Sequence, residues 1–170
     1  MELHEVIGPD EIRDTVKRLA SEIARDHMGK NPVLVGVMKG SFIFLADLAR
    51  ELSMPVELDF IRAKSYGPGT ESSGSVRILH DIEADIRGRD VIVVEDIVDT
   101  ALTLGSVVRH LREKGPARIS ICALLDKPSR RRVDCRLDYV GMEVKDAFLV
   151  GYGLDLSEAH RNLPGIHELR

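Results

Sequence analysis

The sequence contains no tryptophan, and aromatic residues of all kinds make up only 4% of its 170 positions. Proteins that bind single-stranded nucleic acid without sequence preference stack bases on aromatic side chains, so this composition disfavours such a role. The net charge of -4 likewise gives no sign of a general affinity for nucleic acid or membrane surfaces. We therefore expect no nucleic-acid partner.

Cysteine is also scarce, and the two that occur, Cys122 and Cys135, form no cluster of the metal-binding type. The N-terminus lacks a basic segment followed by an apolar one, and no apolar run approaches the roughly 20 residues that cross a bilayer. These absences predict a protein of a reducing, cytoplasmic compartment with no membrane partner.

What the chain does contain is an ordinary globular composition, with 44% hydrophobic and 31% charged residues. We expect one domain over residues 1–170, with a core at about 30–130. Helical periodicity begins at Pro9 and ends near Gly29, and it returns over 42–52, where Ser41 is a candidate cap, and over 103–114. Strand patterns cover 33–38, 56–63, 76–80, 91–96, 119–125, 139–144 and 148–152. The alternation of strands and helices between 33 and 125 predicts an α/β fold with a central parallel sheet.

The stretch from Ser65 to Ser75 is too rich in glycine and serine to pack, which predicts a mobile loop over about 64–75. Its single aromatic residue, Tyr66, lies at the base.

Three carboxylates follow an apolar strand pattern, and they are the most informative feature of the sequence. Glu95, Asp96 and Asp99 are followed by Thr100 and Thr103. One interpretation is a solvated loop whose acids cap the next helix. The other is a site at the carboxyl end of the strand, where Asp99 acts as a base, Glu95 and Asp96 hold ribose hydroxyls or Mg²⁺, and the N–H groups of 100–103 bind phosphate.

Two nucleotide-binding motifs are missing. No Gly-x-x-x-x-Gly-Lys-Ser/Thr occurs, which excludes a P-loop NTPase. The run that begins Gly151-Tyr-Gly153 lacks the third glycine of a dinucleotide fingerprint, which disfavours a nicotinamide-dependent enzyme.

Five segments in order resemble the type I phosphoribosyltransferases, and among these the branch that uses hypoxanthine. The run from Glu95 to Thr103 is similar to the signature that binds 5-phosphoribosyl-1-pyrophosphate, and Val37–Ser41 resembles the pyrophosphate loop. Leu58–Tyr66 is similar to the start of a flexible catalytic loop. Leu124–Lys127 resembles the purine-reading segment, and Phe148–Asp155 with Arg161–Pro164 resembles a C-terminal hood. The resemblance covers essentially the whole chain.

This resemblance implies Mg²⁺-dependent transfer of the phosphoribosyl group to hypoxanthine, and also to guanine, which gives IMP or GMP and pyrophosphate. It implies a sheet flanked by helices, a hood from the N-terminal segment and about 145–170, and a homodimer or homotetramer. The implied site residues follow by role. Asp99 accepts the proton at purine N7 or orients the base through a hydrogen bond. The 5′-phosphate is cradled by Asp99, Thr100, Ala101, Leu102 and Thr103, and the ribose and the metal are held by Glu95 and Asp96. Pyrophosphate is bound by Lys39, Gly40 and Arg161, and Ser65 and Tyr66 close over it. The purine is bound by Lys127, Phe148, Leu149 and Asp155, and Asp155 also reaches the metal partly through water.

Two departures from the family pattern bear on this assignment. Ala101 stands where glycine is usual, and we predict a negative φ there with phosphate binding retained. Leu156–His160 replaces a segment in which bacterial relatives tend to carry tyrosines, so the packing around Arg161 is open. The family pattern also places a peptide bond that is often cis at Met38-Lys39.

Two rival functions use the same fold. Pyrimidine attenuation regulators bind RNA and nucleotides, but Lys127, Phe148, Arg161 and the acidic net charge argue against that role. Xanthine–guanine enzymes are nearer relatives, and the stretch from Leu58 to Tyr66 fits the hypoxanthine branch better.

Overall fold

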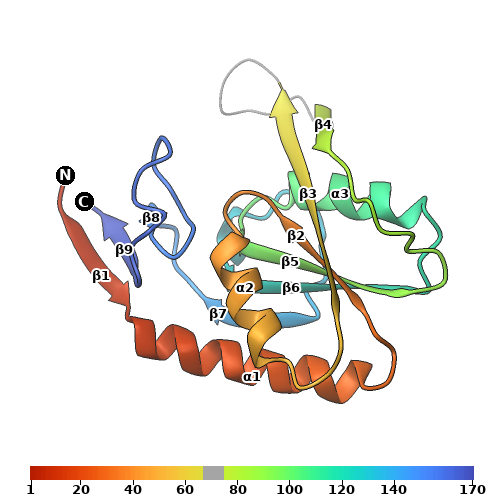
Figure 1. Ribbon diagram of the computed structural model, residues 1–170. Coiled ribbons are helices and arrows are strands. Elements are labelled where there is room, and N and C mark those ends of the chain that lie inside the picture. The colour runs from red at the N-terminus through yellow and green to blue at the C-terminus, as the bar shows by residue number, and fades with distance from the viewer. Residues whose placement is uncertain (67–74) are drawn as a thin grey trace.

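A twisted six-stranded sheet forms the centre of the protein, in a computed structural model that describes residues 1–66 and 75–170 (Figure 1). Its strand order is β4-β3-β2-β5-β6-β7. Strands β3, β2, β5, β6 and β7 run parallel, whereas β4 is antiparallel to β3. Their bounds are β2 Val33–Val37, β3 Glu57–Tyr66, β4 Ser75–His80, β5 Asp90–Val98, β6 Arg118–Asp126 and β7 Tyr139–Glu143.

The predicted α/β fold with a parallel sheet is therefore confirmed, with one correction at its edge. No helix separates β3 from β5 among the residues the structure describes; β4 returns alongside β3, with Ser65 opposite Val76 and Lys64 opposite Arg77. The strands extend to Tyr66 and resume at Ser75, so the ends of the predicted loop at 64–75 belong to a ladder. The rest of that loop lies outside the described residues.

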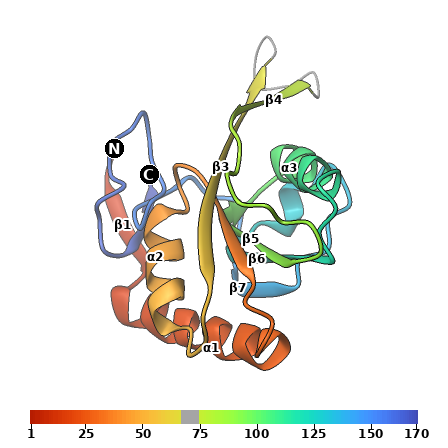
Figure 2. The same cartoon turned by 45° about the vertical axis from the view of Figure 1, so that its right-hand side comes forward.

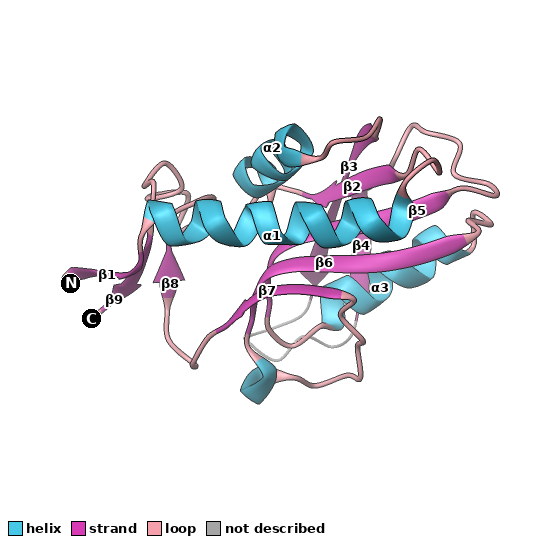
Figure 3. Cartoon of the chain, turned by 90° about the horizontal axis from the view of Figure 1, so that it is seen from below, coloured by secondary structure: helices cyan, strands magenta, loops and turns pink. Residues whose placement is uncertain are grey.

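Helices cover both faces of the sheet (Figure 3). Helices α1 (Pro9–His27) and α2 (Phe42–Glu51) lie on one face, and α3 (Leu102–Arg112) lies on the other. The apolar run of β5 follows from this arrangement, because Ile92 and Val94 pack under α1 and α2 while Val91 and Val93 pack under α3. The short helix η1 (Pro128–Arg130) follows β6.

Ser41 does not cap α2 as the sequence suggested. Its hydroxyl donates to the carbonyl oxygen of Val37 at 2.7 Å, and no side chain caps the helix. The buried hydroxyl instead ties the turn that follows β2 to the end of that strand.

Exposed and buried residues alternate in β3 between Leu58 and Arg62, and one of the buried residues is an acid. Leu58 and Phe60 are half-exposed, whereas Asp59 and Ile61 are buried. The carboxylate of Asp59 tolerates burial because it accepts hydrogen bonds from the backbone N–H groups of residues 60, 83 and 84 at 2.7–2.8 Å.

The hood is a separate three-stranded sheet formed by both ends of the chain (Figure 1). Strand β9 (Ile166–Leu169) lies between β1 (Leu3–Ile7) and the two-residue β8 (Leu149–Val150), and both pairings are antiparallel. The two termini meet, because the N–H of Glu2 donates to the carbonyl of Arg170 at 2.9 Å and the reverse bond measures 3.1 Å.

Among the described residues, every helix is too short or too polar to cross a membrane. Both thiols are free, with Cys122 buried and Cys135 partly buried.

Candidate active site

The acidic motif lies where the sequence predicted, at the carboxyl end of β5. Glu95 and Asp96 lie near the C-terminal end of this strand, and Asp99 is the first residue of the connection to α3. Burial raises the pKa of Glu95 well above its usual value, and the neighbouring charge of Asp96 raises it further. Burial also raises the pKa of Asp96. Two buried carboxyl groups held this close favour a ligand that supplies positive charge or hydrogen-bond donors.

Ala101 adopts a left-handed conformation, with φ 67° and ψ 10°, so the prediction of a negative φ is wrong. The residue is buried at the N-cap of α3, and its carbonyl accepts from the N–H of Gly105 at 2.9 Å. The tight strand-to-helix connection requires this backbone conformation, which costs an alanine about 1–2 kcal/mol. Ahead of it, the Thr100 hydroxyl accepts from the N–H of Leu102 at 3.3 Å.

Asp99 is held by two arginines that were not predicted from the sequence to form part of the site. Arg130 Nε donates to Asp99 Oδ1 at 3.1 Å, and Arg131 Nη1 donates to the Asp99 carbonyl at 2.9 Å. Arg131 also pairs with Asp126 at the end of β6. These arginines are visible in the sequence as the basic run 130–132 after Lys127. Their contact with Asp99 depends on the fold and could not be predicted from the spacing.

Lys127 follows β6, and its side chain points to the segment that carries Phe148. The residue is only 8% exposed, and Nζ donates to the Ala147 carbonyl at 2.5 Å and lies 3.9 Å from Asp146 Oδ1. Phe148 is 51% exposed, so its ring is not a core residue. Leu149 begins β8 and is partly buried. A buried cation therefore lies beside an exposed aromatic residue.

This pair is connected to the acidic motif by ion pairs. Arg130 Nη1 lies 3.7 Å from Asp146 Oδ2, and the same guanidinium contacts Asp99. The sequence placed Asp99, Lys127 and Phe148 in three separate segments, and the structure brings these segments together at one edge of the sheet.

The turn after β2 packs tightly against the acidic motif on one side and the hood on the other. Met38-Lys39 is a cis peptide bond. A Cβ on Gly40 would lie 1.9 Å from Asp96 Oδ2, and a Cβ on Gly153, whose φ is 100°, would lie 2.1 Å from the Gly40 carbonyl oxygen. Only glycine permits either approach, so these glycines set the distance between the turn, the acids and the hood.

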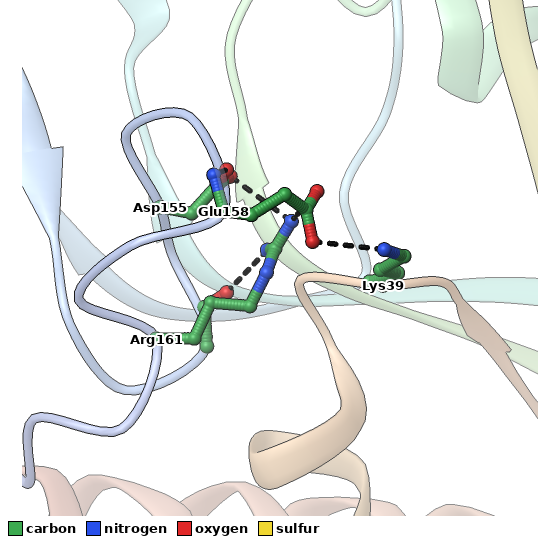
Figure 4. A network of polar contacts seen from close by, with 5 residues as sticks. Lys39, Asp155, Glu158 and Arg161 are labelled. Atoms are coloured by element: carbon green, nitrogen blue, oxygen red, sulfur yellow. Dashed lines mark hydrogen bonds and ion pairs between the residues drawn. The ribbon is translucent and has the colours of Figure 1, made fainter.

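Lys39 and Arg161 converge, as expected for two residues that bind one anion, and a carboxylate lies between them (Figure 4). Lys39 Nζ is 2.8 Å from Glu158 Oε2, and Arg161 Nη2 is 3.0 Å from Glu158 Oε1 and 3.2 Å from Asp155 Oδ1. Arg161 Nη1 donates to the Gly153 carbonyl at 2.7 Å. Glu158 is not among the residues predicted from the sequence to form the site.

Ser65 and Tyr66, which the resemblance implies close over the pyrophosphate, lie at the end of β3. Ser65 Oγ lies 3.1 Å from Thr103 Oγ1, which joins the end of β3 to the first turn of α3. Tyr66 lies next to two cations, with Arg77 at 5.4 Å and Lys64 at 5.6 Å from its ring centroid.

The residues expected to serve a metal do not form a ready-made cage. Among the described residues, no cluster of three or more His, Cys, Asp or Glu side chains could hold an ion by itself. Asp155 accepts from Arg161 and from the N–H of Glu158. The buried oxygen donors of Glu95 and Asp96 nevertheless suit Mg²⁺, which is commonly held by one or two carboxylates with substrate phosphates and water.

Comparison with known proteins identifies the family. Residues 8–157 match the model of the phosphoribosyl transferase domain. The hypoxanthine-guanine phosphoribosyltransferase of Bacillus subtilis is 44% identical over 165 residues, which is 97% of this chain and 92% of that protein. The hypoxanthine phosphoribosyltransferase of Salmonella typhimurium is 45% identical over 163 residues, which is 94% of this chain and 92% of that protein.

Solved structures agree over the full length of the fold. A hypoxanthine-guanine phosphoribosyltransferase from Bacillus anthracis, with a HEPES molecule in its active site, superposes with a TM-score of 0.96 at 45% identity and covers 99% of this chain and 100% of that one. A hypoxanthine phosphoribosyltransferase from Staphylococcus aureus gives the same TM-score at 39% identity, over 98% of this chain and 91% of that one. With the acidic motif at the carboxyl edge of β5 and the hood beside it, the chain belongs to the phosphoribosyltransferase family.

Proposed function

We propose that this protein is a purine salvage enzyme that transfers the 5-phosphoribosyl group of 5-phosphoribosyl-1-pyrophosphate to hypoxanthine, with guanine as a second substrate. The products are the nucleoside 5′-monophosphate and pyrophosphate. The observation that carries this proposal is the buried Lys127 beside the exposed Phe148 ring, joined through Arg130 to Asp99. The names of the relatives at 44–45% identity support the same reaction.

Recognition of a 6-oxopurine follows from the chemistry of lysine. The ammonium group of Lys127 has only hydrogen-bond donors, so it suits a carbonyl oxygen at purine C6 and not the amino group of adenine. With adenine, both groups would be left as unpaired donors in a buried position, and such a mismatch gives strong discrimination. The exposed face of Phe148 is then available to stack on the base.

The reaction breaks the bond between ribose C1 and the pyrophosphate oxygen and forms the bond from C1 to the purine nitrogen. Positive charge develops on the ribose ring, and negative charge develops on the leaving group. Lys39 and Arg161 are the residues we assign to the leaving pyrophosphate. Asp99 is assigned to the purine N7 proton, either accepting it or orienting the base. The turn 100–103 receives the 5′-phosphate at the N-terminus of α3.

We also propose that Mg²⁺ takes part, held by Glu95 and Asp96 with a contribution from Asp155. The raised pKa values of the buried pair support this, because a bound cation would compensate the charge that burial penalises. When bound, Mg²⁺ supplies charge neutralisation to the pyrophosphate and orients the ribose hydroxyls.

The first test offers the purified protein 5-phosphoribosyl-1-pyrophosphate and Mg²⁺ with hypoxanthine, guanine, xanthine, adenine or uracil in parallel. We expect monophosphate from hypoxanthine and guanine, and none from adenine or uracil. No product from any base would turn attention to a regulator of the same fold, which an RNA-binding shift assay would detect.

The second test is Asp99→Asn, which keeps the shape of the side chain and removes its basicity. Turnover should fall by about 10²-fold or more, with binding of 5-phosphoribosyl-1-pyrophosphate largely intact. Asp134→Asn makes the same chemical change at an exposed position and serves as the control. Wild-type turnover in Asp99→Asn would exclude an essential base at this position.

Self-association into a homodimer or homotetramer is a further part of the proposal. Leu58 and Phe60 are half-exposed and lie on the same face of β3. They belong to the part of β3 that precedes its pairing with β4, which begins at Arg62. An exposed apolar pair on an unpaired edge suits contact with a second copy. Light scattering of the wild type and of Phe60→Ser tests this, since a smaller mass for the variant is expected.

A further inference from the structure

The turn between Asp155 and Arg161 carries a carboxylate into the space between the two cations assigned to pyrophosphate. Each oxygen of Glu158 contacts a different cation, with Oε2 at 2.8 Å from Lys39 and Oε1 at 3.0 Å from Arg161 (Figure 4). Lys39 comes from the turn after β2 and Arg161 from the hood, so the carboxylate bridges two parts of the protein that are 122 residues apart in sequence.

The backbone of this turn is arranged to present that side chain. Residues 157 and 158 have φ values of 51° and 68°, and Leu156 pairs with Ala159 across the turn. The N–H of Glu158 donates to Asp155 Oδ2 at 2.7 Å, which fixes the start of the side chain. The left-handed residues are not glycine, and such conformations persist only where the surrounding contacts determine them.

A bridging carboxylate uses the same donors that a phosphate group would use. In Glu158, two oxygens of one anionic group each accept from a different cation. One phosphoryl group would contact Lys39 and Arg161 in the same way. Glu158 and a ligand phosphate therefore exclude each other.

We propose that the Glu158 carboxylate competes with the pyrophosphate group of the substrate for Lys39 and Arg161. The carboxylate holds these two cations together when no diphosphate is bound, and it must leave before a diphosphate binds. This inference rests on the proposed roles of Lys39 and Arg161. The carboxylate can leave without a change in the fold, because its side chain is 63% exposed and can rotate into solvent.

The competition has a quantitative signature. If only the fraction of molecules with Glu158 displaced can bind, the apparent affinity of every ligand that needs both cations is reduced by the same factor. Partly exposed ion pairs contribute a factor of about two to five each, so removing the two that Glu158 makes should tighten such ligands about 4- to 25-fold. A nucleoside monophosphate uses the 100–103 turn and Lys127, so its affinity should not change.

The experiment is calorimetric titration of three probes into the purified protein: pyrophosphate with Mg²⁺, 5-phosphoribosyl-1-pyrophosphate with Mg²⁺, and IMP. The variant Glu158→Gln keeps the size of the side chain and removes its charge. Glu113→Gln, at an exposed position after α3, is the control for the change in net charge. Glu158→Asp, which is too short to reach both cations, provides a second variant if Glu158→Gln does not fold.

In Glu158→Gln we expect pyrophosphate and 5-phosphoribosyl-1-pyrophosphate to bind more tightly by a common factor, with IMP unchanged and Glu113→Gln like the wild type. If Glu158 only holds Arg161 in position, removing its charge would weaken pyrophosphate binding. Weaker or unchanged pyrophosphate binding, with IMP still bound, would overturn this inference alone. Failure of the wild type to bind any of the three probes would overturn the proposed function as well.

Discussion

The approach of Gly153 to Gly40 gives a prediction whose size can be worked out from the structure. In Gly153→Ala the new Cβ would lie 2.1 Å from the Gly40 carbonyl oxygen, about 1 Å closer than real contacts allow. The backbone φ of 100° adds a cost of about 1–2 kcal/mol for any side chain. The turn after β2 cannot retreat, because Gly40 is itself packed against the Asp96 carboxylate.

We therefore expect the hood turn to move outward. Arg161 moves with it, since Arg161 Nη1 donates to the Gly153 carbonyl and the Gly153 N–H donates to the Arg161 carbonyl at 2.9 Å. A displacement of about 1 Å at a binding group can cost about 10²-fold in rate. We expect kcat/KM for 5-phosphoribosyl-1-pyrophosphate to fall by about that factor, and the free energy of unfolding to fall by about 2–4 kcal/mol from strain and overpacking.

Gly88→Ala is the matched control. Gly88 also has a positive φ, 70°, but a Cβ there would meet no atom within 4 Å. This variant carries the backbone strain without the clash, and part of the strain is offset by the lower entropy of the unfolded chain, so we expect a loss of at most about 1 kcal/mol and full activity. Steady-state kinetics and thermal unfolding measure both effects. Equal behaviour of the two variants would refute the reasoning, because it would show that the contact with Gly40 imposes nothing.

Three further predictions concern single side chains. Lys127→Met removes the charge-assisted hydrogen bond to the base that we propose, so KM for hypoxanthine should rise about 10- to 100-fold while binding of 5-phosphoribosyl-1-pyrophosphate stays unchanged. An unchanged KM for hypoxanthine would contradict the proposed role of Lys127. Arg130→Ala removes an exposed partner of Asp99, so kcat/KM should fall by no more than about fivefold, and a fall beyond 10²-fold would place Arg130 in the chemistry itself. Tyr139→Phe removes the 2.7 Å bond to Asp26, which, with Arg25, lowers the pKa of that carboxyl group. The stabilisation by this bond is complete above the unfolded pKa of about 3.9 and disappears as pH falls through the folded value. Denaturant unfolding should thus show a loss of about 1–2 kcal/mol at pH 7 that shrinks below pH 4, and a loss independent of pH would contradict this.

The sequence predicted most of the helices and strands, because these depend on local patterns. The apolar run before Glu95 required a strand covered on both faces, and the structure has helices on both. Local patterns do not say which face of an alternating strand is buried. In β3 the buried face carries Asp59, whose burial depends on N–H groups of residues 83 and 84, more than 20 positions away.

The same limit applies to the active site. The φ of Ala101 was predicted wrongly, because residue type favoured a negative value while the geometry of the β5–α3 connection required a positive one. The bridge from Lys39 to Glu158 joins residues 119 apart, and no spacing rule connects them. Family resemblance supplied the residues that we propose bind ligands, and the fold supplied the residues that contact them, such as Arg130 beside Asp99 and Glu158 beside Lys39.

The pairing of the two chain ends has a consequence for the topology of the backbone. Glu2 and Arg170, which flank β1 and β9, exchange backbone hydrogen bonds, so the first and last residues of this chain lie side by side (Figure 2). The β1–β9 ladder depends on which residues lie side by side and not on where the backbone is interrupted. A short linker could join the present termini, and new ends could open at an exposed turn such as the one at Gly88. The hood would then become an internal segment of a circularly permuted protein, with its strands in the same places.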